Sequence, residues 1–185
     1  KFLGFEQIFK NALTGLPNRL SLQARMPELL QSAVTSGTKV AIIYIDLDHF
    51  KDINDSRGHR SGDLLLATTA ARLRDCVRPE DLVVRMGGDE FIVAAIDAQH
   101  TGHIDALAQR LAASIEVPLT HDGEALETSA SMGIAVFPDH GADADQLLTN
   151  ADIALYQAKA AGRNNHQFFA AAMSVAFSER IFLEQ

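Results

Sequence analysis

The chain has no tryptophan, a single cysteine and no long uninterrupted apolar run. One cysteine, Cys76, excludes an internal disulfide and fits a reducing compartment. No apolar stretch approaches the roughly 20 residues that a membrane-spanning helix needs, and no signal-peptide pattern is visible. Basic residues are in the minority, because 16 Lys and Arg stand against 24 Asp and Glu, a net charge of −8. Without a basic stripe, binding to nucleic acid or to an anionic membrane is not expected, and the chain is predicted to be a soluble cytoplasmic domain.

The composition is that of a folded domain. Its 185 residues predict one domain that can bury a core, and 47% hydrophobic content is ordinary for a globular protein. The chain starts at a lysine rather than a methionine, so we expect a fragment of a longer protein. There is no G-x-x-x-x-G-K-[ST] loop, which argues against the P-loop manner of holding a triphosphate.

The most informative segment is RMGGDEF at residues 85–91, which lies between two short apolar, β-branched segments. This pattern predicts a hairpin whose turn carries the adjacent carboxylates of Asp89 and Glu90. Gly87 and Gly88 have no Cβ, so a flat ligand can lie against the backbone there. Carboxylates beside such a ligand indicate a hard divalent cation and phosphate chemistry. A solvated turn that favours Gly and Asp is the competing interpretation of the tetrapeptide alone.

Several further segments resemble those of the GGDEF family, the diguanylate cyclases of bacterial signalling. The matching segments are NALTGLPNR (Asn11–Arg19), IDLDHFKDINDSRGHRSGD (Ile45–Asp63), SMGIAVFP (Ser131–Pro138) and ADIALYQAKAAGRN (Ala151–Asn164). They follow the family's order and spacing from about residue 11 to 169. The resemblance implies an α/β palm-type fold, with a central, mostly antiparallel sheet flanked by helices, similar to the catalytic domains of class III nucleotidyl cyclases.

Apolar periodicity and capping residues predict alternating helices and strands. The expected elements are a helix after Asn18, a strand at Lys39–Leu47, a helix from Ser61 to about Val77, a helix around Ile104–Ile115, a strand at about Thr128–Phe137, a helix from near Asp145 to Ala161 and an edge strand at Gln167–Phe169. Pro27 lies inside the first of these helices and should bend it or shift its start.

The resemblance also implies a reaction, the condensation of two GTP molecules to cyclic di-GMP with release of pyrophosphate. By resemblance, Asp46, the Leu47 carbonyl, Asp89 and Glu90 hold Mg²⁺ or Mn²⁺ at the end of the first strand and at the hairpin. Asp89 or Glu90 takes the proton of the attacking hydroxyl or fixes the metal that lowers its pKa, and the sequence does not separate these roles. A turn residue at a strand end would explain Asp46 taken alone.

Residues expected to bind GTP fall into two groups. Lys51, Lys159 and Arg163 are expected at the phosphates, the last two sharing a helical face at i, i+4, although an exposed basic face is an equal alternative.

Asn54 and Asp63 match the family's spacing and are expected to select guanine, because an amide and a carboxylate complement its Watson–Crick edge. A carboxylate in the first turn of a helix is the alternative for Asp63. His59 is expected to brace the loop between them, and Gly87 and Gly88 lie against the substrate.

An Arg-x-x-Asp string at Arg78 and Asp81 matches the family's inhibitory motif, at which bound cyclic di-GMP slows the enzyme. The arginine fork and the carboxylate can grip its phosphate and guanine edges. One departure from the family is Asn11, where an aspartate is usual. Asn11 loses the charge, so an ion pair that braces this turn, with Arg19 as the expected partner, would be weakened.

The two ends of the chain indicate neighbours outside the domain. Residues 1–10 are expected to end an upstream connecting helix from a sensor domain, 11–170 to form the GGDEF domain, and 171–185 to begin a linker helix to an EAL phosphodiesterase domain. Two domains must face one another during catalysis, so a transient homodimer is expected. A GTP-binding module that regulates a linked EAL domain is the alternative function, and a purely structural dimerisation domain is a third.

Overall fold

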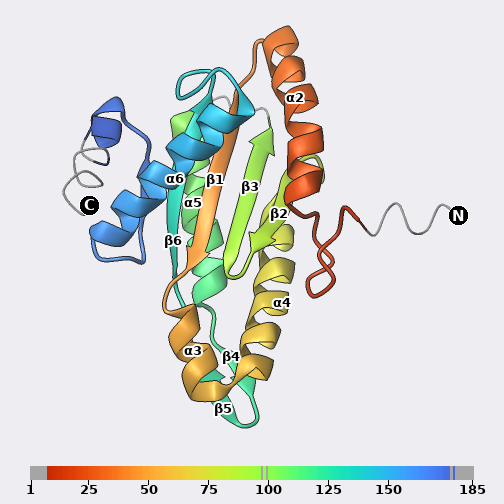
Figure 1. Cartoon of the computed structure of the whole chain (residues 1–185), viewed down its shortest axis with the longest axis vertical. Helices are drawn as coiled ribbons and strands as arrows, with labels where there is room; N and C mark the ends of the chain where they lie inside the picture. The colour runs from red at the N-terminus through yellow and green to blue at the C-terminus, as the bar shows by residue number, and fades with distance from the viewer. Residues whose placement is uncertain (1–7, 97, 99, 176, 178–185) are drawn as a thin grey trace, which may run out of the picture.

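A five-stranded sheet forms the centre of the molecule (Figure 1), and the computed structural model describes residues 8–96, 98, 100–175 and 177. The strand order is β2-β3-β1-β6-β7. The strands are β1 (Val40–Leu47), β2 (Leu82–Gly87), β3 (Glu90–Ile96), β6 (Ala130–Phe137) and β7 (His166–Phe168). All neighbours are antiparallel except β6 and β7, which are parallel. The mostly antiparallel sheet and the edge position of the last strand are therefore confirmed.

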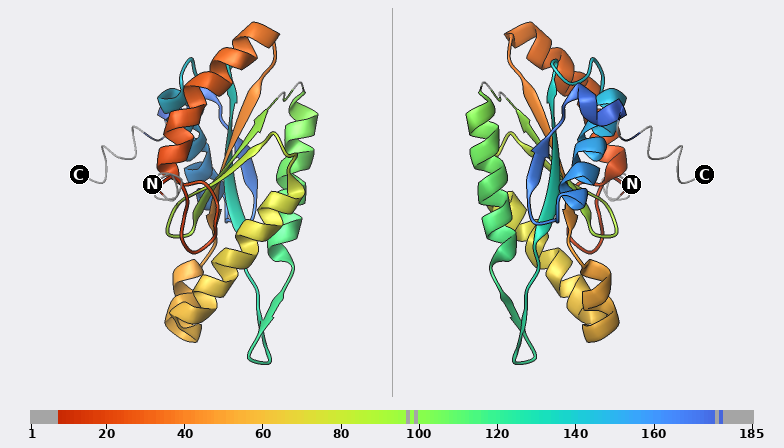
Figure 2. Two further views of the ribbon diagram at one scale, coloured as in Figure 1. Left: turned by 90° about the vertical axis from the view of Figure 1, so that its right-hand side faces the viewer. Right: turned by 90° about the vertical axis from the view of Figure 1, so that its left-hand side faces the viewer.

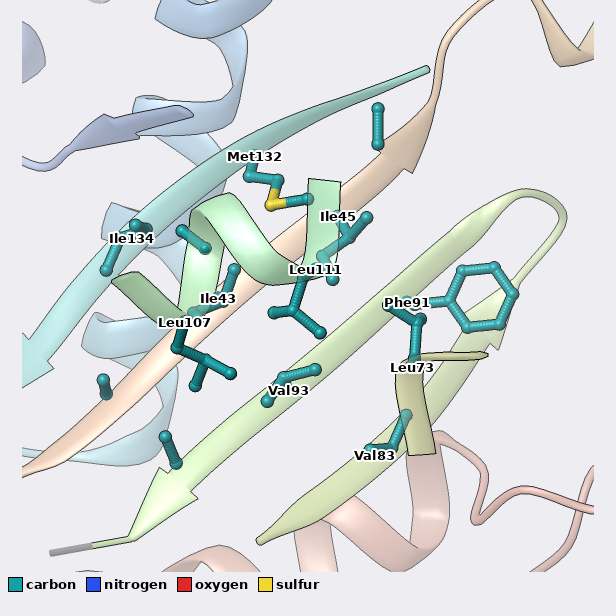
Figure 3. Close-up of a cluster of buried hydrophobic side chains, with 14 of the residues drawn as sticks. Ile43, Ile45, Leu73, Val83, Phe91, Val93, Leu107, Leu111, Met132 and Ile134 are labelled. Atoms are coloured by element: carbon teal, nitrogen blue, oxygen red, sulfur yellow. The ribbon is translucent and has the colours of Figure 1, made fainter. Parts of the chain in front are cut away.

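Four long helices cover the two faces of this sheet (Figure 2). One face is covered by α2 (Arg19–Ser36) and α6 (Ala144–Ala160), and the other by α4 (His59–Cys76) and α5 (Thr101–Glu116). β1 is almost wholly apolar because it lies between both layers. Ile43 and Ile45 pack with Leu107 and Leu111 of α5 (Figure 3), whereas alternate residues such as Ile42 pack under α2 and α6.

Of the two predicted helix caps, Asn18 is confirmed and Ser61 is wrong. Asn18 caps α2, since its Oδ1 accepts a hydrogen bond from the Ser21 N–H at 3.1 Å, and the helix continues through Pro27. Ser61 is not a cap. A short helix that the sequence did not predict, α3 (Phe50–Arg57), is followed by Gly58 with φ 82°, and α4 begins directly after it. Ser61 instead donates its hydroxyl to the Arg57 carbonyl.

A second, two-stranded sheet projects at the same end as α3 (Figures 1 and 2). It consists of β4 (Leu119–His121) and β5 (Glu124–Leu126), which the sequence also did not predict. Three-residue strands are too short to show an alternating pattern. An ion pair between Arg57 and Glu124 joins this two-stranded sheet to α3.

Only parts of the two chain ends are described. Residues 8–10 form a turn and an isolated bridge between Lys10 and Pro17 rather than a helix, and residues 1–7 lie outside the described residues. Residues 171–175 are helical, and most of the expected linker helix lies outside the described part. Within the residues that the structure describes, no helix is both long and apolar enough to cross a membrane.

Candidate active site

The predicted hairpin is formed by β2 and β3, with Gly88 and Asp89 at its turn. Gly87 and Gly88 have φ values of 145° and 52°, a region that residues with a Cβ rarely adopt. Gly87 pairs with Glu90 across the turn, so Asp89 lies in the turn itself and Glu90 is the first residue of β3. The two glycines are therefore required by the backbone itself, whatever ligand the turn accepts.

Strand register brings Asp46 beside this turn. Asp46 pairs with Glu90 across the antiparallel strands β1 and β3, so both side chains leave the same face of the sheet. The next residue, Leu47, donates its N–H to the Asp89 carbonyl at 3.2 Å. The carboxylates of Asp46, Asp89 and Glu90 therefore meet at one end of the sheet, although Asp46 is more than 40 residues from the other two in sequence. We call these three residues the acidic cluster.

Burial and mutual repulsion disfavour the charged forms of the carboxylates in this acidic cluster. Burial raises the pKa of Asp46, opposed by Lys159 and reinforced by the charges of Asp89 and Asp48. Burial likewise raises the pKa of Asp89, while Lys159 and Arg85 oppose the shift and Glu90 adds to it. A bound cation would relieve this repulsion, and carboxylates with a backbone carbonyl are the ligands that Mg²⁺ prefers.

The protein ligands alone would not complete a metal site. Among the described residues, no three His, Cys, Asp or Glu side chains are placed to hold a metal ion by themselves. Mg²⁺ usually keeps waters and takes one or two carboxylates together with substrate phosphates. The residues present therefore fit a cation that arrives with a phosphate-bearing ligand.

Lys159 pairs with the cluster rather than standing free for a ligand. Its Nζ lies 2.9 Å from Oδ2 of Asp46. Arg163 does not share its helical face, which corrects the sequence prediction: α6 ends at Ala160, and Arg163 follows with φ 64°. The turn after the helix leaves Arg163 exposed.

The residues expected to contact guanine lie at the corner between α3 and α4. A Cβ at Gly62 would lie only 1.9 Å from Oδ1 of Asn54, so the side chain of Asn54 packs directly on the helix turn that precedes Asp63. His59 is the first residue of α4. Asp63 is exposed and lies beyond the first turn, which has no acidic residue, so helix-end stabilisation does not explain it. Lys51, also exposed, lies on α3.

Arg85 links the hairpin turn to Asn11, and the sequence analysis did not identify it as a site residue. Its Nε and Nη2 donate to the Gly88 carbonyl at 3.1 and 2.7 Å, and its Nη1 donates to Oδ1 of Asn11 at 3.0 Å. Burial lowers the pKa of Arg85, and the nearby carboxylates of Asp63 and Asp89 oppose this. The partner of Asn11 is thus Arg85, not Arg19, and an arginine two residues before a Gly-Gly turn was a readable signal.

Asp48 is a second residue that sequence reasoning missed, and it is only 4% exposed. Its carboxylate accepts hydrogen bonds from the hydroxyls of Ser129 and Ser131 at 2.6 and 2.7 Å and from the Asn164 N–H at 3.0 Å. It ties the end of β1 to the start of β6 and to the loop after α6. The positions of Asp46 and of Arg163 both depend on this junction.

Replacing Asp48 by Ala should therefore lower the free energy of unfolding by about 3 kcal/mol, because three donors, of which the Ser131 hydroxyl is buried, lose a charged acceptor. Chemical denaturation measures this. Asp139→Ala is the control, since it removes only the exposed ion pair with Lys39 and should cost less than about 1 kcal/mol. Equal losses in the two variants would contradict the assigned role.

The Arg-x-x-Asp string directly precedes β2, so it lies at the opposite end of that strand from the hairpin turn. It lines a cavity together with residues of α5. Asp81 accepts from the N–H groups of Arg78 and Ile96 at 3.0 and 2.9 Å. The guanidinium of Arg78 has no hydrogen bond or ion pair with the described residues. A cavity of about 220 Å³ opens here, and its polar lining residues include Arg78, Asp81, His103 and Arg110. Arg110 was not anticipated from the sequence.

A model of the family "Diguanylate cyclase, GGDEF domain" matches residues 9–165. The chain belongs to the GGDEF family. A solved structure of the GGDEF domain of TpbB (YfiN) from Pseudomonas aeruginosa is similar to this domain with a TM-score of 0.88 and 35% identity, covering 91% of this chain and 99% of that one. The palm-like fold expected from the sequence is thus confirmed.

Two curated relatives from Pseudomonas aeruginosa are named for different activities. The cyclic di-GMP phosphodiesterase NbdA is 41% identical over 95% of this chain and 22% of its own length. The bifunctional diguanylate cyclase/cyclic di-GMP phosphodiesterase MucR is 40% identical over 92% of this chain and 25% of its length. This GGDEF domain therefore spans about a quarter of the length of these relatives, and its family is one of cyclic di-GMP signalling.

Proposed function

We propose that this domain is an active diguanylate cyclase, which condenses two GTP molecules into cyclic di-GMP and pyrophosphate. The observation that carries the proposal is the pairing of Asp46 with Glu90, which sets the acidic cluster beside an open Gly-Gly turn. A domain that only folded or dimerised would have no use for half-buried carboxylates whose pKa values are raised by burial and mutual repulsion.

In the proposed reaction, each domain holds one GTP and aims its 3′-hydroxyl at the α-phosphorus of the other. The metal-binding set is Asp46, the Leu47 carbonyl, Asp89 and Glu90. Bound Mg²⁺ or Mn²⁺ would supply charge neutralisation at the phosphates and a more acidic 3′-hydroxyl. Asp89 or Glu90 accepts the proton of that hydroxyl or holds the cation, and Gly87 and Gly88 let the nucleotide lie against the turn.

Lys51, Lys159 and Arg163 are proposed to neutralise the triphosphate. The Nζ of Lys159 lies 2.9 Å from Oδ2 of Asp46. Asp46 would hold the cation that accompanies GTP, and the Lys159 ammonium would then be available to the phosphate oxygens. Each charge then keeps a partner throughout, which avoids leaving a buried carboxylate unpaired.

Asn54 and Asp63 are proposed to read guanine. Their support is local geometry: the side chain of Asn54 packs on Gly62, so it lies beside the helix turn that carries Asp63. A carboxylate that accepts from the N1–H and N2 amine of guanine would be left unpaired by adenine, which gives selectivity. His59, at the start of α4, is proposed to brace this corner.

The experiment that tests the function is incubation of the concentrated domain with GTP and Mg²⁺, followed by chromatography. Cyclic di-GMP should accumulate from GTP, no cyclic di-AMP should form from ATP, and chelation of the metal should stop the reaction. Binding of GTP without any product would contradict the enzymatic proposal and favour the regulatory alternative.

We also propose that cyclic di-GMP inhibits the enzyme at Arg78 and Asp81. The support is an arginine without a partner among the described residues at the mouth of a cavity that Arg110 also lines. Arg78→Ala should weaken cyclic di-GMP binding by about tenfold, since one charge-assisted contact is lost, and relieve product inhibition without lowering the initial rate. Calorimetry and progress curves measure both, with Arg74→Ala as an exposed control. Unchanged product affinity would contradict the inhibitory site.

A regulatory GTP-binding module is the second candidate. The specific observation in its favour is that NbdA, at 41% identity, is named for phosphodiesterase activity. In that case the helical residues 171–175 would lead towards a downstream EAL domain, and an upstream sensor would set the state of the GGDEF domain. GTP would then bind at the same residues and change the activity of the linked domain rather than react.

A further inference from the structure

Tyr44 stands out on the face of β1 that α2 and α6 cover. The other residues of β1 on this face before Asp46, Val40 and Ile42, are aliphatic and buried, and Tyr44 itself is only 8% exposed. Its hydroxyl lies at the end of the sheet that carries the acidic cluster. A buried tyrosine hydroxyl requires a hydrogen-bond partner, and packing alone does not require a hydroxyl at this position.

The partner is a member of the proposed site. The Tyr44 hydroxyl donates to Oε2 of Glu90 at 3.2 Å. A tyrosine hydroxyl keeps its proton at neutral pH. It therefore acts as a constant neutral donor to the carboxylate.

The two paired carboxylates are held in the same manner. Lys159 contacts Oδ2 of Asp46, and Tyr44 contacts Oε2 of Glu90, so each carboxylate keeps a second oxygen for a ligand. A glutamate side chain with three rotatable bonds loses conformational entropy when a ligand must order it. A tyrosine whose ring is fixed by core packing can order the glutamate by its hydrogen bond before the ligand binds, so less entropy is lost on binding.

We propose that Tyr44 is a positioning residue, whose hydroxyl orients the Glu90 carboxylate so that its second oxygen is presented to the cation that accompanies GTP. The inference rests on the proposed function of the same site and extends it to a residue outside the acidic cluster. Tyr44 touches neither substrate nor cation and acts only through Glu90.

Tyr44→Phe tests this, because it keeps the ring and removes only the hydroxyl. The readout is Mn²⁺ affinity, measured by electron paramagnetic resonance in the presence of guanosine 5′-[α,β-methylene]triphosphate, which cannot release pyrophosphate. We expect about tenfold weaker Mn²⁺ binding, the usual size of an effect from a residue that supports a metal ligand. Nucleotide affinity without metal should not change.

Two comparisons separate positioning from packing. In a Glu90→Gln background, Tyr44→Phe should cause no further loss of Mn²⁺ affinity, because the carboxylate it orients is gone. Ile42→Val, on the same face of the same strand, perturbs the core without touching Glu90 and should leave Mn²⁺ affinity unchanged. An equal loss in the Glu90→Gln background, or in Ile42→Val, would overturn the inference.

The outcomes also separate this inference from the proposed function. A wild-type domain that binds no Mn²⁺ with the analogue contradicts both the enzymatic site and the role of Tyr44. A wild-type domain that binds Mn²⁺, together with a Tyr44→Phe variant that binds it equally well, contradicts the role of Tyr44 alone.

Discussion

Asp89→Ala and Glu90→Ala are each expected to abolish cyclic di-GMP synthesis while the domain stays folded. Each change removes a carboxylate that is proposed to hold the cation or to accept the hydroxyl proton, and the remaining members of the set would hold the cation with one charge fewer. Both residues lie at the hairpin turn and are only partly buried, so Asp89→Ala should cost less than about 1 kcal/mol of folding stability. Glu90→Ala should cost about 1–3 kcal/mol, because it leaves the buried Tyr44 hydroxyl without its acceptor. Chromatography of the products and thermal unfolding measure the two expectations.

Glu28→Ala is the matched control, since this exposed carboxylate on α2 lies outside the site. Its product formation should equal that of the wild type. Wild-type turnover in both hairpin variants would remove the catalytic assignment, and loss of the fold in either would show that the turn has a structural role instead.

Activity is expected to rise more steeply than linearly with enzyme concentration and to approach second order when dilute. Among the described residues the domain has one Gly-Gly hairpin, one Asp46 and one corner that is proposed to contact guanine, so it should hold one GTP. Cyclic di-GMP has two-fold symmetry, so two domains must meet active site to active site, each presenting the same surface. We expect the isolated domain to be largely monomeric, which makes this encounter rate-limiting. Initial rates over a dilution series, with light scattering on the same samples, measure the order.

Tethering should remove this dependence. A dimeric coiled coil fused before Phe2 in a compatible register makes the encounter intramolecular. The effective concentration of one domain near the other is then about 1 mM. The rate per domain should rise and become independent of dilution. The same fusion carrying Glu90→Ala controls for effects of the coiled coil alone. First-order dependence from a preparation shown to be monomeric would rule out the two-domain mechanism.

The sequence was informative where a pattern is local. The apolar β1, the capping role of Asn18 and the Gly-Gly hairpin each depend on residues close in the chain, and each was predicted correctly. The convergence of Asp46 with the hairpin came from resemblance, because no local pattern specifies that β1 and β3 are neighbours. The strand register then supplied what the sequence lacked, the direct pairing of Asp46 with Glu90.

The misses have physical causes. α3 was overlooked because its residues are mostly polar and none is buried, so it shows no apolar period. The positions of Arg85 and Asp48 depend on contacts with Asn11 and with Ser129 and Ser131, which are remote in sequence. Arg163 is different, since Gly162 just before it is an ordinary signal that a helix has ended and could have corrected the prediction.

The most direct test of the central claim is a quantitative account of products from the tethered dimer supplied with GTP and Mg²⁺. The proposed reaction predicts one cyclic di-GMP and two pyrophosphates for every two GTP consumed, with neither product from the tethered Glu90→Ala variant. A tethered wild-type dimer that binds GTP and releases no cyclic di-GMP, or that forms it equally well without Glu90, would contradict the account.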